Sequence, residues 1–180
     1  MERPPPSSVE IDRTTDWPDV LSSVRDYWQE KRAGRSMPSR GDISPAQIRT
    51  QLPHILLADV IEGGKDFRYR LVGDRLVQFF HSDPTGKLMT EVIAPFGDET
   101  TRATLASYRR VVERRAPVRL TGSGSFFGQD PKHFDAFLAP LSNDGATVNM
   151  ILGTFVFIWD PAHPFRPPSD PLQANARDSH

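Results

Sequence analysis

An unbroken apolar run near the C-terminal end of the chain constrains the fold most strongly. The run MILGTFVFIW (Met150–Trp159) contains no charged residue. It is about half of the roughly 20 residues that a helix needs to span a bilayer. A strand covered on both faces has this appearance, because both sets of its alternating side chains are buried. We therefore expect a central strand of a buried sheet, not a membrane span.

Other segments have the pattern of strands as well. Ile55–Ile61 is apolar nearly throughout, and in FRYRLVG the side chains of Phe67, Tyr69 and Leu71 alternate with others. Alternation of this kind places those three side chains on one face of a strand. Short turn sequences separate the segments, so neighbouring strands should pair antiparallel. The expected closing strands are Val118–Phe126, His133–Leu141 and Thr147–Trp159.

Helices are expected before and between these strands. Asp16–Ala33 places Leu21, Val24 and Trp28 on one stripe. Asp98–Arg114 begins with acidic residues and ends with basic ones, as the helix dipole favours. Only short helical pieces fit between the second strand and this helix. The order of elements predicts an α+β domain: a five-stranded antiparallel sheet with short helices on one face and an N-terminal flanking helix.

Composition divides the chain into a folded part and two tails. Many of the 17 prolines gather near the two ends. Segments rich in proline, serine and charge bury too little apolar surface to offset their ordering entropy. We expect flexible tails at residues 1–14 and 161–180, a flanking helix at 15–34 and the sheet domain at 35–160.

Bulk properties exclude several classes of function. The formal net charge is -1, so nothing indicates a nucleic-acid partner or a membrane surface. The sequence has no cysteine, and its N-terminal segment lacks the apolar core of a signal peptide. These features predict a cytoplasmic protein without disulfides or thiolate chemistry.

Several short motifs are informative when their order along the chain is considered together. They are Trp28, PSRGDISP (Pro38–Pro45), Leu52-Pro53, FRYRLVG (Phe67–Gly73), Thr85-Gly86 and PLSNDG (Pro140–Gly145). With the order of elements, they resemble the PAS domain, and more narrowly a group of short stand-alone bacterial PAS proteins. The resemblance runs from about Trp28 to Phe157. It implies a non-enzymatic sensory or protein-interaction module whose sheet cups a small cavity beneath the short helices.

The resemblance also raises the question of a cofactor, and the residues present reduce the range of possible cofactors. Photoadduct flavins and thioester-linked chromophores need a cysteine, so the composition excludes them. Haem-binding PAS domains usually ligate iron through a histidine on the long helix, and Asp98–Arg114 has none. Only His81, near the short helices, remains as a candidate haem ligand. Flavin without photochemistry has no positive signal here, so the identity of any cofactor stays unknown.

Two interpretations of the core stay open. The side chains beneath the helices either fill it completely or line a cavity for a small, mostly apolar ligand. In the second case Tyr69, Tyr108 or His81 would orient the ligand. The candidate ligand-binding residues are Tyr69, Phe79, Phe80, His81, Met89, Tyr108, Phe134, Met150 and Leu152.

The N-terminal helix is the predicted route of output. No kinase, cyclase or DNA-binding segment is recognisable, so a signal would pass through a homodimer or another signalling protein. The candidate interface is the apolar stripe with two tryptophans, and packing of this stripe onto the chain's own sheet is the alternative. Its residues are Trp17, Leu21, Val24 and Trp28.

The competing hypothesis is an enzyme with a cone-shaped α+β fold of the ketosteroid-isomerase sort. Asp135 would be the base, and Tyr69 or Tyr108 the oxyanion donor. The strand count and order fit that fold poorly. His133 and Asp135 could share a metal only with a third ligand, and none is evident.

Two further patterns have structural interpretations. Thr121–Ser125 (TGSGS) lacks the lysine and following helix of a phosphate-binding loop, so its glycines indicate a bulge or close packing. The cluster of Arg109, Arg110, Arg114 and Arg115 fits a solvated helix end rather than an anion site.

Overall fold

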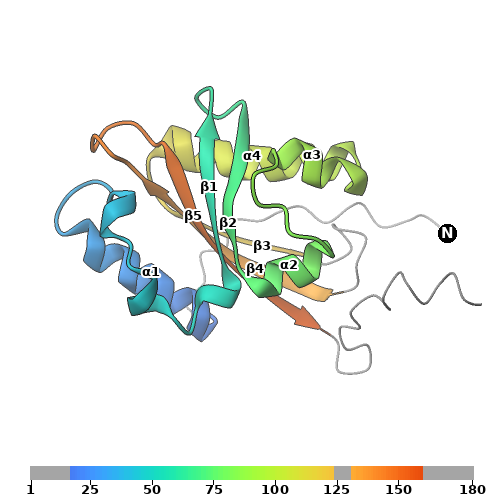
Figure 1. The fold of residues 1–180 in the computed structure, drawn as a ribbon, viewed down its shortest axis with the longest axis horizontal. Helices are drawn as coiled ribbons and strands as arrows, with labels where there is room; N and C mark the ends of the chain where they lie inside the picture. The colour runs from blue at the N-terminus through green and yellow to red at the C-terminus, as the bar shows by residue number, and fades with distance from the viewer. Residues whose placement is uncertain (1–16, 124–130, 160–180) are drawn as a thin grey trace, which may run out of the picture.

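A single antiparallel sheet organises the part of the chain that the computed structural model describes, residues 17–123 and 131–159. Its strand order is β2-β1-β5-β4-β3 (Figure 1). The predicted central position of the last apolar segment is therefore confirmed. The predicted tails lie outside the described residues, as do residues 124–126 of the third predicted strand. The strands are β1 (Ile55–Ile61), β2 (Asp66–Val72), β3 (Val118–Ser123), β4 (Pro131–Leu141) and β5 (Met150–Trp159).

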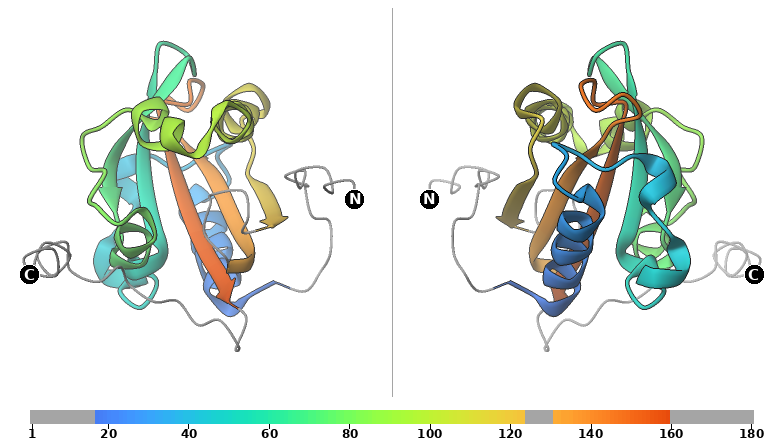
Figure 2. Two further views of the ribbon diagram at one scale, coloured as in Figure 1. Left: turned by 90° about the vertical axis from the view of Figure 1, so that its right-hand side faces the viewer. Right: turned by 90° about the vertical axis from the view of Figure 1, so that its left-hand side faces the viewer.

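Helices cover both faces of this sheet (Figure 2). One face packs against α1 (Asp19–Arg32) and is called the α1 face below. The other, the inner face, lies under α2 (Asp74–Phe80), α3 (Met89–Ile93) and α4 (Asp98–Arg114). The predicted α+β architecture is confirmed. Short 3-10 helices complete the connections: η1 (Arg40–Asp42), η2 (Pro45–Ile48), η3 (Leu52–His54) and η4 (Ala94–Phe96).

Strand register decides which side chains reach which face, because directly paired residues of antiparallel strands point the same way. Phe134 pairs with Phe157, and Phe137 pairs with Thr154. Trp17 lies just before α1 in the sequence. Its ring lies edge-on to that of Phe137, with the two ring centroids 5.7 Å apart. Phe137 therefore marks the α1 face, and Phe134, of opposite parity, marks the inner face.

The second strand departs from simple alternation. Tyr69 pairs with Ala58, but a register shift then places Leu71 opposite Leu57. Since Ala58 and Leu57 point to opposite faces, Leu71 lies on the face opposite to Tyr69. The expectation that Leu71 shares a face with Phe67 and Tyr69 is wrong, because an extra residue in β2 interrupts the period.

The helix α1 is attached to the sheet by its own apolar stripe. Leu21 and Val24 are fully buried, and Trp28 is almost so. The Trp28 indole Nε1–H donates to the backbone oxygen of Pro140 in β4 at 2.9 Å. The Tyr27 hydroxyl accepts a hydrogen bond from the Ser44 backbone N–H at 2.7 Å, ahead of η2. Helix, connection and sheet therefore form one packed unit.

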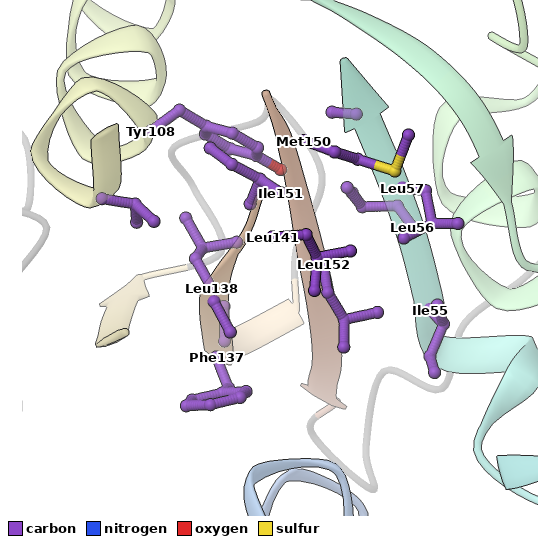
Figure 3. Close-up of a cluster of buried hydrophobic side chains, with 14 of the residues drawn as sticks. Ile55, Leu56, Leu57, Tyr108, Phe137, Leu138, Leu141, Met150, Ile151 and Leu152 are labelled. Carbon is purple, nitrogen blue, oxygen red and sulfur yellow. The ribbon is translucent and has the colours of Figure 1, made fainter. Parts of the chain in front are cut away.

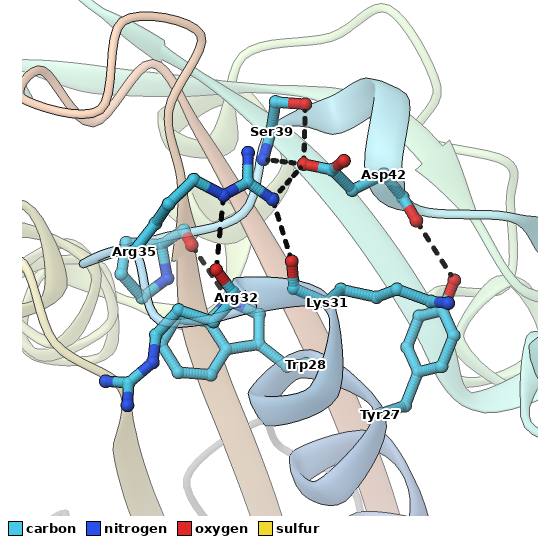
Figure 4. A network of polar contacts seen from close by, with 8 residues as sticks. Tyr27, Trp28, Lys31, Arg32, Arg35, Ser39 and Asp42 are labelled. Atoms are coloured by element: carbon cyan, nitrogen blue, oxygen red, sulfur yellow. Dashed lines mark hydrogen bonds and ion pairs between the residues drawn. The ribbon is translucent and has the colours of Figure 1, made fainter.

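Two aspartates form the main side-chain hydrogen bonds within the motifs that resemble those of PAS domains. Asp42 accepts hydrogen bonds from the Ser39 N–H at 2.7 Å and from the Arg35 guanidinium at 2.9 Å (Figure 4). Asp144 accepts from the N–H groups of Ala146 and Thr147 at 2.8 and 2.7 Å. These Asp144 contacts fold the chain into a tight turn, so β5 begins at Met150 and not at the predicted Thr147.

The Asp42 carboxylate makes the α1 connection sensitive to acid. Hydrogen bonds from Ser39, and then from Arg35, lower the pKa of Asp42 to about 2. A carboxyl whose pKa is lower in the folded than in the unfolded chain stabilises the fold above the unfolded pKa. That contribution is lost as the pH falls from about 4 through about 2.

We expect Asp42→Asn to make the free energy of unfolding less dependent on pH between about pH 4 and pH 2. The measurement is urea denaturation at a series of pH values. Ser39→Ala should act in the same direction, because it removes one donor to the carboxylate. Parallel curves for the native chain and Asp42→Asn across this range would contradict the assignment.

Candidate functional site

Aromatic side chains form a row along the inner face of the sheet. The ring of Phe79, from α2, stacks on Phe157 of β5 with centroids 4.1 Å apart and planes 8° from parallel. Phe155 extends the row at 6.4 Å from Phe157. Phe80 lies 5.4 Å from Phe79 and 5.9 Å from Tyr69 of β2. Tyr69 and Phe79 are buried, whereas Phe80, Phe155 and Phe157 are only half-buried. The row thus joins buried rings to half-buried ones.

Two buried phenols lie at the inner end of this row. Tyr108 of α4 reaches toward Ile151 of β5 (Figure 3), and its ring centroid is 5.1 Å from that of Phe67. Burial raises the pKa of both Tyr69 and Tyr108, so each stays protonated near neutral pH. A protonated phenol can donate a hydrogen bond, so both side chains bring a donor to a mostly apolar core.

The structure brings most of the predicted ligand-binding residues to the inner side. Tyr69, Phe79, Phe80 and Phe134 lie on the inner face or the helix that covers it, and Met89 and Tyr108 are buried on α3 and α4. His81 is exposed at the C-terminal end of α2.

Met150 and Leu152 lie elsewhere. They pair with Leu141 and Ala139, which share the parity of Phe137 and so face α1. The register separates them from the inner face by the thickness of the sheet.

Sequence reasoning missed Phe155 and Phe157. These residues have the opposite parity to Met150 and Leu152 within one continuous apolar strand. A strand buried on both faces shows no alternation, so its sequence does not reveal which residues face which side. A signal was available in the neighbouring strand, because the polar residues His133 and Asp135 in β4 mark the parity of the α1 face.

The close-packing interpretation of the TGSGS segment holds at Gly122. A Cβ built there would lie 2.4 Å from Cε1 of the Phe134 ring. Only glycine lets this ring lie flat against β3. Gly124 lies outside the described residues.

The predicted interface residues are used within the chain itself. Leu21, Val24 and Trp28 are buried against the sheet, so a partner could reach them only if α1 left its place. Trp17 is half-buried and lies beside two guanidinium groups, those of Arg25 at 4.7 Å and Arg119 at 4.8 Å from its ring centroid. The stripe therefore packs onto the chain's own sheet, which was the alternative interpretation.

A buried ion pair lies on the α1 face beside Trp17. Arg119 of β3 donates to Asp135 of β4 through Nε at 2.9 Å and through Nη2 at 2.7 Å. The two side chains are only 5% and 6% exposed. Asp135 is separated from Tyr69 and Tyr108 by the sheet, so the base and oxyanion donor of the isomerase hypothesis do not meet.

Within the part of the chain that the structure describes, no group of three or more His, Asp or Glu side chains could hold a metal ion. Across residues 17–123 and 131–159, no helix has the length and hydrophobicity to cross a bilayer.

A five-stranded antiparallel sheet with short helices and one longer helix over its inner face is the architecture that the PAS resemblance implied. The chain belongs to the PAS domain family, whose sequence profile matches residues 18–156. Domains of this family are typically sensory or regulatory signalling modules and are generally not enzymes. The resemblance seen in the sequence is confirmed.

Solved structures similar to this chain include a PAS domain and a light-oxygen-voltage domain. The PAS domain of BvgS from Bordetella pertussis is 21% identical, with a TM-score of 0.49, and covers 63% of this chain and 82% of its own. A light-oxygen-voltage domain studied with a flavin analogue is 14% identical, with a TM-score of 0.43 and coverage of 65% and 85%. No curated protein matches the chain. The family assignment therefore rests on the sequence profile.

Proposed function

We propose that this PAS domain is a non-enzymatic sensory module of the cytoplasm that holds a small, mostly apolar ligand on its inner face. One observation carries the proposal: the aromatic row from Tyr69 to Phe155 is continuous and joins two buried rings to three half-buried ones. Flat apolar surfaces that are only partly covered favour a planar or apolar partner.

The two phenols define the polar part of this ligand. Because Tyr69 and Tyr108 are protonated donors, they favour an acceptor such as a carbonyl or carboxylate oxygen over a cation. A ligand that accepts from either hydroxyl would add a hydrogen bond inside a mostly apolar site.

Output would pass through dimerisation or a signalling partner. Ligand on the inner face contacts α2 and β5 through Phe79 and Phe157, whose rings already stack. A ligand that orders α2 against the sheet would bias the arrangement of the surfaces around it. The domain proper would be residues 35–160, with 15–34 as the flanking helix.

Native mass spectrometry of the full chain, purified from its own host, tests this proposal. We expect a dimer that carries a small molecule, released under denaturing conditions. Tyr69→Phe should weaken rebinding of the released molecule roughly 2- to 12-fold, the equivalent of one net hydrogen bond.

Tyr27→Phe is the matched control, since it removes a phenol hydroxyl that binds Ser44 outside the inner face. It should leave ligand affinity unchanged. Protein from the host that is ligand-free at every charge state would contradict the ligand proposal, and a strict monomer would contradict dimerisation.

A further inference from the structure

The two edges of the sheet differ in how they are covered. Along β2, the Tyr69 N–H donates to the Lys87 oxygen at 3.1 Å, and the Gly86 N–H donates to the Tyr69 oxygen at 2.7 Å. The segment after α2 therefore protects that edge. At the opposite edge, β3 pairs with β4 and with no other described strand. Alternate backbone groups of an edge strand point outward, where they can pair with another strand.

A groove of about 380 Å³ lies between β3 and α4 at this same edge. Leu120 lines it from the sheet, and one face of α4 lines the other side. The side chains on this helix face are small toward its N-terminal end and long and charged toward its C-terminal end. Its residues are Ala103, Ala106, Ser107, Arg110 and Glu113, next to Arg109.

The charged end of the groove carries both signs. Arg110 and Glu113 are exposed, and neither forms an ion pair with a described residue. The adjacent Arg109 is held in place, since its guanidinium donates to the backbone oxygens of Gly64 and Lys65 at 2.8 and 2.9 Å. The helix face beside this edge is thus firmly attached and carries exposed charges of both signs.

We propose that a second copy of this chain occupies this edge, with β3 of one copy pairing antiparallel with β3 of the other about a two-fold axis. The inference rests on the proposed dimerisation and names the surface that forms it. The α1 stripe does not compete for this role, because it is buried against its own sheet.

The two-fold arrangement makes the grooves complementary. The two α4 helices run antiparallel on the same side of the joined sheet, so the small end of one faces the charged end of the other. Ala103 and Ala106 then lie opposite Glu113 and Arg110 of the second copy, and the small side chains leave room for the long ones. Each groove carries two arginines, Arg109 and Arg110, and one glutamate, Glu113. In this arrangement the alanines of one copy face the charged residues of the other, so like charges do not face each other, as a self-complementary interface requires.

Sedimentation equilibrium of the full chain at micromolar concentrations tests the surface. The variant Ala106→Arg places a further long side chain on an exposed position of the groove. We expect the native chain to be a dimer and Ala106→Arg to raise the dimer dissociation constant at least about tenfold. The matched control is Ala46→Arg, an exposed alanine in η2, which should leave the constant unchanged.

Hydrogen exchange adds a readout specific to strand pairing. Amides in Val118–Ser123 should exchange more slowly in the dimer than in the Ala106→Arg monomer. A dimer that persists unchanged in Ala106→Arg would overturn this surface and leave dimerisation itself standing. A native chain that is monomeric would overturn both, while the ligand measurement by mass spectrometry would be unaffected.

Discussion

Asp135→Ala is expected to lower the free energy of unfolding by about 3–5 kcal/mol, the range for removing one partner of a buried ion pair. The Arg119 guanidinium loses both of its hydrogen bonds to this carboxylate, at 2.9 and 2.7 Å. It remains only 5% exposed on the α1 face, where water cannot replace them. Because the same guanidinium lies over Trp17, the start of α1 should loosen as well. Urea unfolding followed by tryptophan fluorescence measures both effects.

Two controls separate the buried charge from the loss of a contact. The double variant Arg119→Met/Asp135→Leu should be about as stable as the native chain, because neither charge of this pair is then left buried without the other. Asp59→Ala removes a pair with Arg70, whose side chain is 58% exposed, and should cost about 0–1 kcal/mol. A loss of stability in Asp135→Ala no greater than that in Asp59→Ala would contradict the role of the buried ion pair.

Gly73→Ala is expected to destabilise the domain by about 3 kcal/mol, at the upper end for overpacking. A Cβ at this position would lie 2.2 Å from the backbone oxygen of Leu52 and 2.6 Å from the carbonyl carbon of Pro53. Backbone atoms cannot rotate away as a side chain can, so β2 or η3 must move. The φ of Gly73 is -72°, which any residue adopts. Space, and not backbone conformation, therefore requires glycine.

Gly41→Ala is the matched control, because the nearest atom to its Cβ would be the Ser39 hydroxyl oxygen at an ordinary 3.6 Å. Its effect should stay within about 0.5 kcal/mol. Gly73 is also the N-cap of α2, the helix that carries Phe79. If Gly73→Ala unfolds at the same urea concentration as the native chain, the close approach of η3 is wrong.

Gly73 explains why a strand runs directly into a short helix at this point. Its N–H donates to the Ile55 oxygen at 2.7 Å, which ends the β1–β2 ladder and turns the chain onto the inner face. The turn delivers Phe79 and Phe80 to the sheet within one short helix. The change of period in the sequence indicated this break, but not the contact with η3 that depends on glycine.

In the candidate site, too, the sequence indicated some features and not others. Alternation in β2 correctly placed Phe67 and Tyr69 together, because one face of that strand is polar. The continuous apolar sequence of β5 concealed that Phe155 and Phe157 face inward, and Met150 and Leu152 do not. Register across the β4–β5 turn decides this, and it is set by contacts between strands.

The sequence by itself determined the elements of this protein, their order, the central position of β5 and the PAS family, since period, turn chemistry and motif spacing are local properties. Only the tertiary structure decided where α1 packs, that Arg119 meets Asp135 across 16 residues of sequence, and which face each β5 side chain takes. Those outcomes depend on strand register and on competition for buried surface, which are properties of the assembled chain and not of any one segment.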